Sequence, residues 1–166
     1  MVKSALAFGI FLYCLTAPGH CAASLTKADK VVVLKGNRLL MLLKEGLVLK
    51  IYKVALGRSP VGQKIQQGDT KTPEGSYFLD RRIANSRFYR ALHISYPNAD
   101  DIQNAKALGV EPGRDIMIHG LPKGFDDVGP SHRKYDWTKG CIAVTNSEIE
   151  EIWGLVPDGT PIEIKP

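Results

Sequence analysis

Residues 31–56, VVVLKGNRLLMLLKEGLVLKIYKVAL, contain three apolar runs separated by two short polar breaks, Lys35-Gly36-Asn37 and Lys44-Glu45-Gly46. Runs of this length that are rich in leucine and β-branched residues are typical of β-strands. The glycine in each break permits the tight reversal that joins neighbouring antiparallel strands. The stretch therefore predicts a β-meander.

Further strands are predicted along the rest of the chain. Short or alternating apolar runs indicate strands at 76–81, 91–96, 115–119 and 161–164. Residues 57–75 are polar and glycine-rich, which predicts an irregular loop of a length that usually has a functional role. The chain also holds 16 glycines and 10 prolines, more than a helix bundle tolerates.

Two short helices are expected between these strands. Asp100 can cap a helix that ends at Gly109. Residues 145–148, Thr-Asn-Ser-Glu, form a capping box that opens a second helix, which continues to Trp153 with Gly154 behind it. The expected fold class is mixed α/β and β-rich, a β-sandwich or meander with two or three short helices.

The composition limits the class of protein. A chain of 166 residues with 44% hydrophobic and 23% charged residues fits one folded domain, and it fits neither a disordered nor a polytopic membrane protein. The formal net charge of +5 suits a polyanionic partner. Because no stripe of arginine and lysine interleaved with aromatic residues occurs, nucleic acid is not expected as a partner.

The N-terminal segment predicts export. Lys3 precedes an apolar run, residues 5–15, and small residues end the segment at Cys21-Ala22-Ala23. This run is too short to cross about 30 Å of hydrocarbon, so a cleaved signal peptide at 1–23 fits better than a stable membrane span or an uncleaved anchor. We expect a single domain at 24–166, located in the periplasm or the extracytoplasmic cell envelope.

Signal cleavage would leave Cys141 as the only cysteine, so no intramolecular disulfide could form. Gly140 allows close backbone approach, and Lys139 can favour the thiolate. His119 ends a predicted strand 22 residues before Cys141, and an imidazole there could deprotonate a thiol. From the residues alone, a catalytic pair and a small core cysteine both remain open.

The remaining histidines of the predicted domain indicate no metal centre. His93 and His132 show no paired-ligand spacing with His119 or Cys141, so no metal and no cofactor are expected. His93 lies on the strand face opposite Leu92, which predicts exposure or a place in a site wall. His132 stands among charged neighbours and is expected at the solvated surface.

Several ordered motifs resemble the L,D-transpeptidase (YkuD-type) family of peptidoglycan enzymes. The two that carry the signature are IHG (118–120) and TKGCIAVTN (138–146). Three further segments are similar to that family: GDTKTPEGSY (68–77), ISYPN (94–98) and PGRDIMIHG (112–120). The DWTxGCIAVTN form is similar to a subgroup whose members detach, trim or attach groups on peptidoglycan.

The resemblance implies a cysteine nucleophile that attacks a stem peptide and forms a thioester. It makes Cys141 the nucleophile and His119 the base, with the Gly120 carbonyl orienting the imidazole ring. Backbone N–H groups of Gly140 and Cys141, with Lys139 as a further donor, would form the oxyanion hole. The implied partners are peptidoglycan stem peptides and, for some activities, a peptidoglycan-linked protein.

Two departures from the family pattern affect the substrate site. Thr138-Lys139 replaces the usual Ser-His before the Gly-Cys pair, and Ala143 stands where the family commonly has an arginine that can bind a carboxylate. The cations that could compensate are Arg81, Arg82, Arg87 and Arg114. We expect the substrate-binding residues to be Thr138, Lys139, Arg114 and Arg81.

Three functions remain open at this stage. The first is an L,D-transpeptidase, in which an amine resolves the acyl-enzyme. The second is an L,D-carboxypeptidase or an amidase, in which water resolves the acyl-enzyme or a peptidoglycan-linked protein is released. The third is an inactive wall-binding module, although such a module would need neither His119 nor Cys141.

Overall fold

The computed structural model describes residues 26–166, and the predicted signal peptide lies outside the described residues. The predicted meander is confirmed as β1 (Lys30–Leu34), β2 (Leu39–Lys44) and β3 (Leu47–Lys53). Both pairings are antiparallel. Glu45 and Gly46 turn β2 into β3 with positive φ angles of 52° and 80°, the backbone of a tight hairpin turn.

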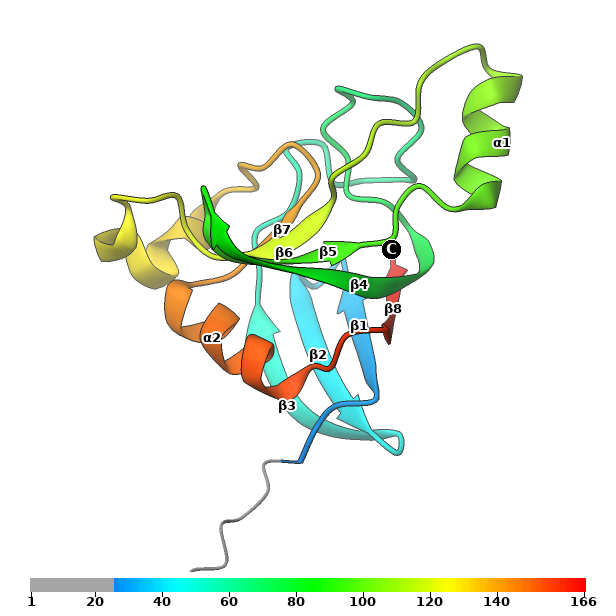
Figure 1. The fold of residues 1–166 in the computed structure, drawn as a ribbon. Coiled ribbons are helices and arrows are strands. Elements are labelled where there is room, and N and C mark those ends of the chain that lie inside the picture. The colour runs from blue at the N-terminus through cyan, green and yellow to red at the C-terminus, as the bar shows by residue number, and fades with distance from the viewer. Residues whose placement is uncertain (1–25) are drawn as a thin grey trace, which may run out of the picture.

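The meander belongs to one eight-stranded sheet with the order β3-β2-β1-β8-β4-β5-β6-β7. The other strands are β4 (Gly75–Ser86), β5 (Tyr89–Ile94), β6 (Met117–His119), β7 (Ile142–Ala143) and β8 (Thr160–Lys165). β8 pairs parallel with β1 and β7 pairs parallel with β6. Figure 1 shows β4 and β5 crossing the direction of the meander, so the sheet is strongly curled.

The two edges of this curled sheet meet near the end of β3. Ala55, just after β3, forms an antiparallel bridge with Ala143 of β7, and the two residues exchange N–H···O bonds of 3.0 and 2.8 Å. The interior is filled by buried aliphatic and aromatic side chains, among them Val31, Leu40, Tyr77, Ile94, Ile118 and Ile142. The contact between the edges brings the segment after β3 beside β7.

Within the described part of the chain, three helices accompany the sheet: α1 (Ala99–Ala107), the 3-10 segment η1 (Asp126–Lys134) and α2 (Asn146–Leu155). The capping box predicted at Thr145 is confirmed, because its hydroxyl accepts from the Glu148 N–H. The predicted start of α1 is wrong by two residues: Asn98, not Asp100, accepts the capping N–H. Among residues 26–166, no helix is long and apolar enough to cross a membrane.

Other boundaries and elements also differ from the prediction. β5 covers Tyr89–Ile94 rather than 91–96, and β6 begins at Met117 rather than at residue 115. Gly154 lies inside the last turn of α2 rather than behind it. β4 continues past residue 81 to Ser86, where a two-residue turn leads into β5. Neither η1, which contains Pro130, nor the two-residue strand β7 was predicted. The β-rich mixed fold itself is confirmed.

Candidate active site

Cys141 and His119 line one cavity of about 300 Å³. His119 ends β6, and Cys141 immediately precedes β7. The parallel register pairs Ile118 with Ile142, so the two strands bring residues 119 and 141 to the same region of the sheet. The rest of the cavity wall consists of Arg58, Arg87, Phe88, Trp137, Thr138 and Lys139.

The turn that carries Cys141 is held by Thr138. Its hydroxyl donates to the carbonyl of Cys141 at 2.8 Å and accepts from the N–H of Gly140 at 3.0 Å. Thr138 therefore borders the cavity while its hydroxyl is used within the turn. The expected role of the Gly140 N–H in the oxyanion hole does not fit this turn, because that N–H is already bonded to the Thr138 hydroxyl. Among the described residues, the N–H groups of Lys139 and Cys141 have no hydrogen-bond partner.

Gly140 is required by close packing as well as by conformation. Its φ angle is +127°, a region that side chains rarely allow. A Cβ atom at this position would lie 2.6 Å from the carbonyl oxygen of Lys71. The long loop 57–75 thus passes directly over the turn that carries Cys141, and only glycine fits between them.

Loop 57–75 is fixed against the site by buried polar contacts. The ammonium of Lys35, almost fully buried, donates to the carbonyls of Gly62 and Thr72 and to Glu74, each at 2.8 Å. The hydroxyl of Thr72 in turn accepts from the N–H of Gly57 at 3.1 Å. These contacts order a glycine-rich segment that would otherwise have many conformations.

Asp136 ties the turn of Cys141 to the segment after β3. One carboxylate oxygen accepts from the Leu56 N–H at 2.9 Å, and the other accepts from the Arg38 guanidinium at 2.8 Å. The N–H of Thr138 donates to the Leu56 carbonyl at 3.1 Å, and the Arg58 N–H donates to the Thr138 carbonyl at 3.2 Å. Residues 136–138 are therefore clamped on both sides.

The ring of His119 is held in one orientation. Its Nδ1 lies 2.7 Å from the carbonyl oxygen of Gly120, which can only accept, so Nδ1 carries the proton and Nε2 has the free lone pair. Phe88 stacks on the ring with 4.4 Å between ring centroids, and Trp137 meets it edge-on at 5.8 Å. Burial lowers the pKa of His119 to about 4, which keeps the ring neutral at pH 7.

Gly120 also has no room for a side chain. A Cβ atom there would lie 2.5 Å from the side-chain oxygen of Asn146, the same oxygen that accepts from the Leu121 N–H at 2.8 Å. The first residue of α2 thus fixes the backbone that follows His119. This contact explains why glycine follows the histidine in this chain.

Cys141 is a neutral thiol at rest. Its Sγ lies 3.6 Å from the Asp115 carbonyl oxygen, and burial raises its pKa to about 11. The expectation that Lys139 favours the thiolate is not met in this state, because Lys139 is exposed and desolvation of the thiol dominates. A neutral imidazole and a neutral thiol suit proton transfer that accompanies attack, rather than a preformed ion pair.

The structure separates the predicted substrate-binding residues. Lys139 lies at the border of two cavities, that of Cys141 and a second, more polar one of about 590 Å³. Arg114 lines the second cavity together with Lys64. Arg81 lies on β4 opposite His93 and lines neither cavity.

Two other arginines occupy the Cys141 cavity instead. Arg87 comes from the turn between β4 and β5, and Arg58 from the start of loop 57–75. Arg58 was missed by the sequence analysis, because its position depends on the contact between loop 57–75 and residue 138. Arg82 is used elsewhere, where it donates to Asp158 and to the carbonyls of Trp153 and Val156.

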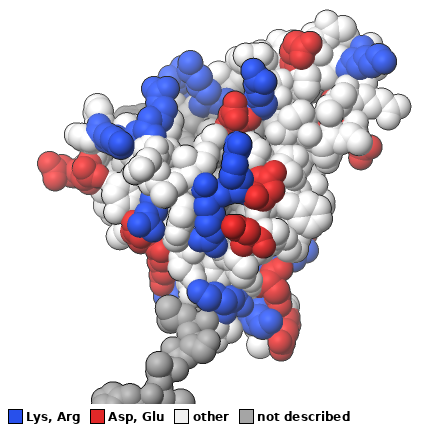
Figure 2. Space-filling view, viewed as in Figure 1, with Lys and Arg blue, Asp and Glu red and all other residues white. Residues whose placement is uncertain are grey.

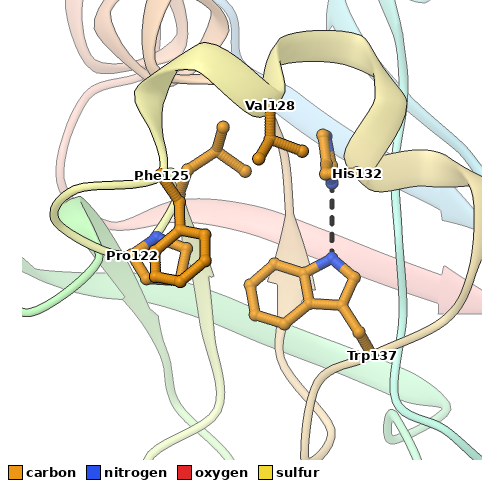
Figure 3. A pocket seen from close by; sticks show the side chains of 6 residues that line it. Pro122, Phe125, Val128, His132 and Trp137 are labelled. Atoms are coloured by element: carbon orange, nitrogen blue, oxygen red, sulfur yellow. Dashed lines mark hydrogen bonds between the residues drawn. The ribbon is translucent and has the colours of Figure 1, made fainter.

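The prediction of a solvated His132 is wrong. The ring is 8% exposed, its Nδ1 lies 3.4 Å from the indole nitrogen of Trp137, and its Nε2 is buried without a partner among the described residues. His93, in contrast, is paired with Asp80 at 2.7 Å, away from Cys141. Figure 3 shows His132 and Trp137 on one side of an apolar pocket of about 240 Å³, with Phe125 and Pro122 opposite.

The charge around the site is mainly positive. Figure 2 shows lysine and arginine side chains gathered over the upper left part of the face in view, above β6 and β7 of Figure 1. Within residues 26–166, no group of three histidine, cysteine or acidic side chains could hold a metal ion.

The fold, the cysteine–histidine cavity and the sequence motifs together define a family. The model of the L,D-transpeptidase catalytic domain, YkuD, matches residues 28–164, and the chain belongs to this family.

Two relatives are assigned to L,D-transpeptidases by name. The chain is 38% identical to YafK of Escherichia coli strain K12 over 111 residues, which cover 66% of this chain and 37% of YafK. It is 28% identical to YqjB of Bacillus subtilis strain 168 over 138 residues, which cover 81% of this chain and 69% of YqjB. The match therefore spans little more than a third of YafK.

Solved structures show the same fold. The helical cell shape determining protein Pgp2 of Campylobacter jejuni superposes with a TM-score of 0.62 at 26% identity, over 89% of this chain and 53% of Pgp2. The L,D-transpeptidase LdtMt1, in complex with imipenem, superposes with a TM-score of 0.53 over 82% of this chain and 58% of LdtMt1. Its 17% identity shows the fold alone.

Proposed function

We propose that this protein is an exported peptidoglycan L,D-transpeptidase that acts through a thioacyl-enzyme on Cys141. The observation that carries the proposal is the joint placement of Cys141 and His119 in one cavity, with Nδ1 of His119 held by the Gly120 carbonyl. That contact leaves Nε2 to act as the base. Membership of the L,D-transpeptidase family supports a substrate from peptidoglycan and a location outside the cytoplasm.

In the proposed acylation, His119 Nε2 takes the thiol proton as Sγ attacks the carbonyl of the diamino acid residue in a stem peptide. A sulfur–carbon bond forms, and the oxyanion receives hydrogen bonds from the N–H groups of Cys141 and Lys139. When the carbon–nitrogen bond breaks, His119 returns the proton to the leaving amine of the terminal D-amino acid. The thiolate of Cys141 does not have to form before the attack, which agrees with the raised pKa of this thiol.

In the proposed second half-reaction, the amine of another stem peptide attacks the thioester. His119 Nε2 takes a proton from this attacking amine, the sulfur–carbon bond breaks as the amide forms, and His119 passes the proton to the departing sulfur of Cys141. Water as the attacking group would give the L,D-carboxypeptidase instead, and a protein-linked leaving group would give the amidase. The three activities share the acyl-enzyme and differ in the leaving or entering group.

The decisive experiment is incubation of the protein with muropeptides, followed by mass analysis of the products. A transpeptidase gives cross-linked stems, a carboxypeptidase gives trimmed stems, and an amidase releases the linked group. Cys141→Ala should abolish all three, and Cys141→Ser should retain far less activity than the wild type. Turnover by Cys141→Ala would refute the mechanism.

Imipenem offers a second test of the nucleophile. Its strained carbonyl should acylate Cys141, giving one adduct of the mass of the drug, and the adduct should be absent in Cys141→Ala. LdtMt1, of the same fold, has been seen in complex with imipenem. An adduct that persists in Cys141→Ala would show that another nucleophile reacts.

A further inference from the structure

The arginines of this protein differ in whether an acidic side chain neutralises them. The chain has eight arginines, all within the described residues. Five lie within 4.0 Å of a carboxylate, in the pairs Arg38–Asp136, Arg82–Asp158, Arg90–Glu150, Arg114–Asp115 and Arg133–Glu148. Arg58, Arg81 and Arg87 have no such partner among residues 26–166, and two of these three line the Cys141 cavity.

Both cavity arginines come from fixed backbone. The N–H of Arg58 donates to the carbonyl of Thr138, three residues before Cys141. The carbonyl of Arg87 accepts from the N–H of Lys123 at 3.2 Å. The guanidinium of Arg87 lies 5.1 Å from the ring centroid of Phe88, and that ring stacks on His119. The Phe88 ring therefore contacts both the guanidinium of Arg87 and the imidazole of His119, the proposed base.

Residue 143 cannot supply the cation itself. Ala143 is fully buried, with His119 of β6 as its neighbour on one side and Ala55 on the other. Two alanines pair where the sheet edges meet, and the buried methyl group of Ala143 carries no charge. The positive charge of this cavity is therefore supplied by other residues of its wall, Arg58, Arg87 and Lys139.

We propose that Arg58 and Arg87 form a carboxylate-binding subsite beside Cys141. Its ligand is the free α-carboxylate of the C-terminal residue of the donor peptide, the residue that leaves when Cys141 attacks. A guanidinium presents paired N–H donors that match the two oxygens of a carboxylate, and neither arginine must first give up an acidic partner. This inference rests on the proposed function, because it assigns the ligand within the same cavity.

The test compares two peptides that differ only in the proposed ligand group. One is a stem tetrapeptide that ends in a free carboxylate, and the other is the same peptide with a C-terminal carboxamide. Binding is measured by calorimetry in the Cys141→Ala background, where no reaction can take place. The variants are Arg58→Gln, Arg87→Gln and the double variant, with Arg81→Gln as a matched control for an exposed, unpaired arginine outside the cavity.

We expect the background protein to bind the carboxylate peptide about 10-fold or more tightly than the carboxamide, the range for a hydrogen bond to a charged group. Each cavity variant should reduce this preference, the double variant should abolish it, and Arg81→Gln should leave it unchanged. Because both guanidinium groups are exposed, the preference should also weaken at high salt.

Equal binding of the two peptides, or a preference that survives in the double variant, would overturn the subsite. The proposed function is judged separately, by whether the enzyme with Cys141 intact forms a thioacyl-enzyme. A protein that binds the carboxylate through Arg58 and Arg87 but never acylates would retain the subsite and lose the transpeptidase proposal.

Discussion

Cys141 should react as a neutral, poorly ionised thiol. Burial raises its pKa to about 11 from the usual 9.0, and the neutral His119 supplies no positive charge to oppose this shift. At pH 7 the thiolate fraction would then be about one in ten thousand, against about one in a hundred for an ordinary thiol of this reference pKa. Alkylation by iodoacetamide should accordingly be about 100-fold slower in the folded protein than in the unfolded chain.

The assay follows alkylation from pH 6 to pH 10, with digestion and mass quantification of the peptide that contains Cys141. In the folded protein the rate should rise about tenfold per pH unit without a plateau, since only the thiolate reacts. The protein unfolded in urea provides the reference profile. His119→Gln should keep the same profile while losing acylation by substrate, because a neutral ring affects proton transfer and not the resting charge.

A plateau of rapid alkylation between pH 6 and pH 8 would refute this reasoning. It would mean that the thiolate already exists at rest, and that cations of the cavity outweigh the desolvation of the sulfur. The role of His119 would then be that of the acid for the leaving group, with no need to take a proton from the thiol.

Three further predictions concern stability and the turn of Cys141. Acidification from pH 6.5 towards pH 4 should lower the free energy of unfolding, because burial lowers the pKa of His119 and His132 to about 4 and the unfolded chain binds these protons first. The loss of unfolding free energy is at most about 3 kcal/mol per histidine. Urea titrations should show that this free energy depends less steeply on pH in His132→Gln than in the wild type, and equal pH dependence in the two proteins would contradict the role of His132. Gly140→Ala should cost about 1–3 kcal/mol of stability through backbone strain alone and should abolish acylation, with thermal melts and intact-mass analysis as readouts; a fully active variant would argue against the close packing. Asp136→Ala should cost about 1–3 kcal/mol in urea titrations by leaving a backbone N–H without its acceptor, whereas Asp136→Asn, which keeps an acceptor oxygen, should cost less; equal losses would assign the effect to the ion pair.

Those parts of the fold that depend on neighbouring residues could be predicted from the sequence. The meander follows from apolar runs and turn glycines within residues 31–56, and the start of α2 follows from the capping box at Thr145. The parallel pairing of β1 with β8 could not be found in this way, because its partners stand about 130 residues apart and no local pattern selects them. β7 is too short, at two residues, to show any periodicity.

Some residues of the cavity could likewise be predicted from their neighbours in the sequence, and others could not. Cys141 and His119 could be assigned to catalysis because their motifs resemble those of a known family, and the structure gives a steric reason for the glycine beside each of them in the oxygen atoms that a Cβ would meet. His132 was misassigned because its charged neighbours suggest solvent, whereas contact with Trp137 buries the ring. Chain neighbours thus indicated where the backbone is constrained but not which side chains the folded sheet would enclose.

The place of Arg58 in the cavity depends on long-range packing. Arg58 lies in a polar loop, where a positively charged residue is common and does not indicate a binding site. It reaches the cavity because the sheet edges meet at Ala55 and Ala143, which brings residue 58 beside Thr138. The contact that buries Ala143 therefore also brings to the cavity wall an arginine that has no acidic partner among the described residues. The position of Arg58 in the cavity wall is thus a consequence of how the sheet edges pack, and no local sequence pattern indicates it.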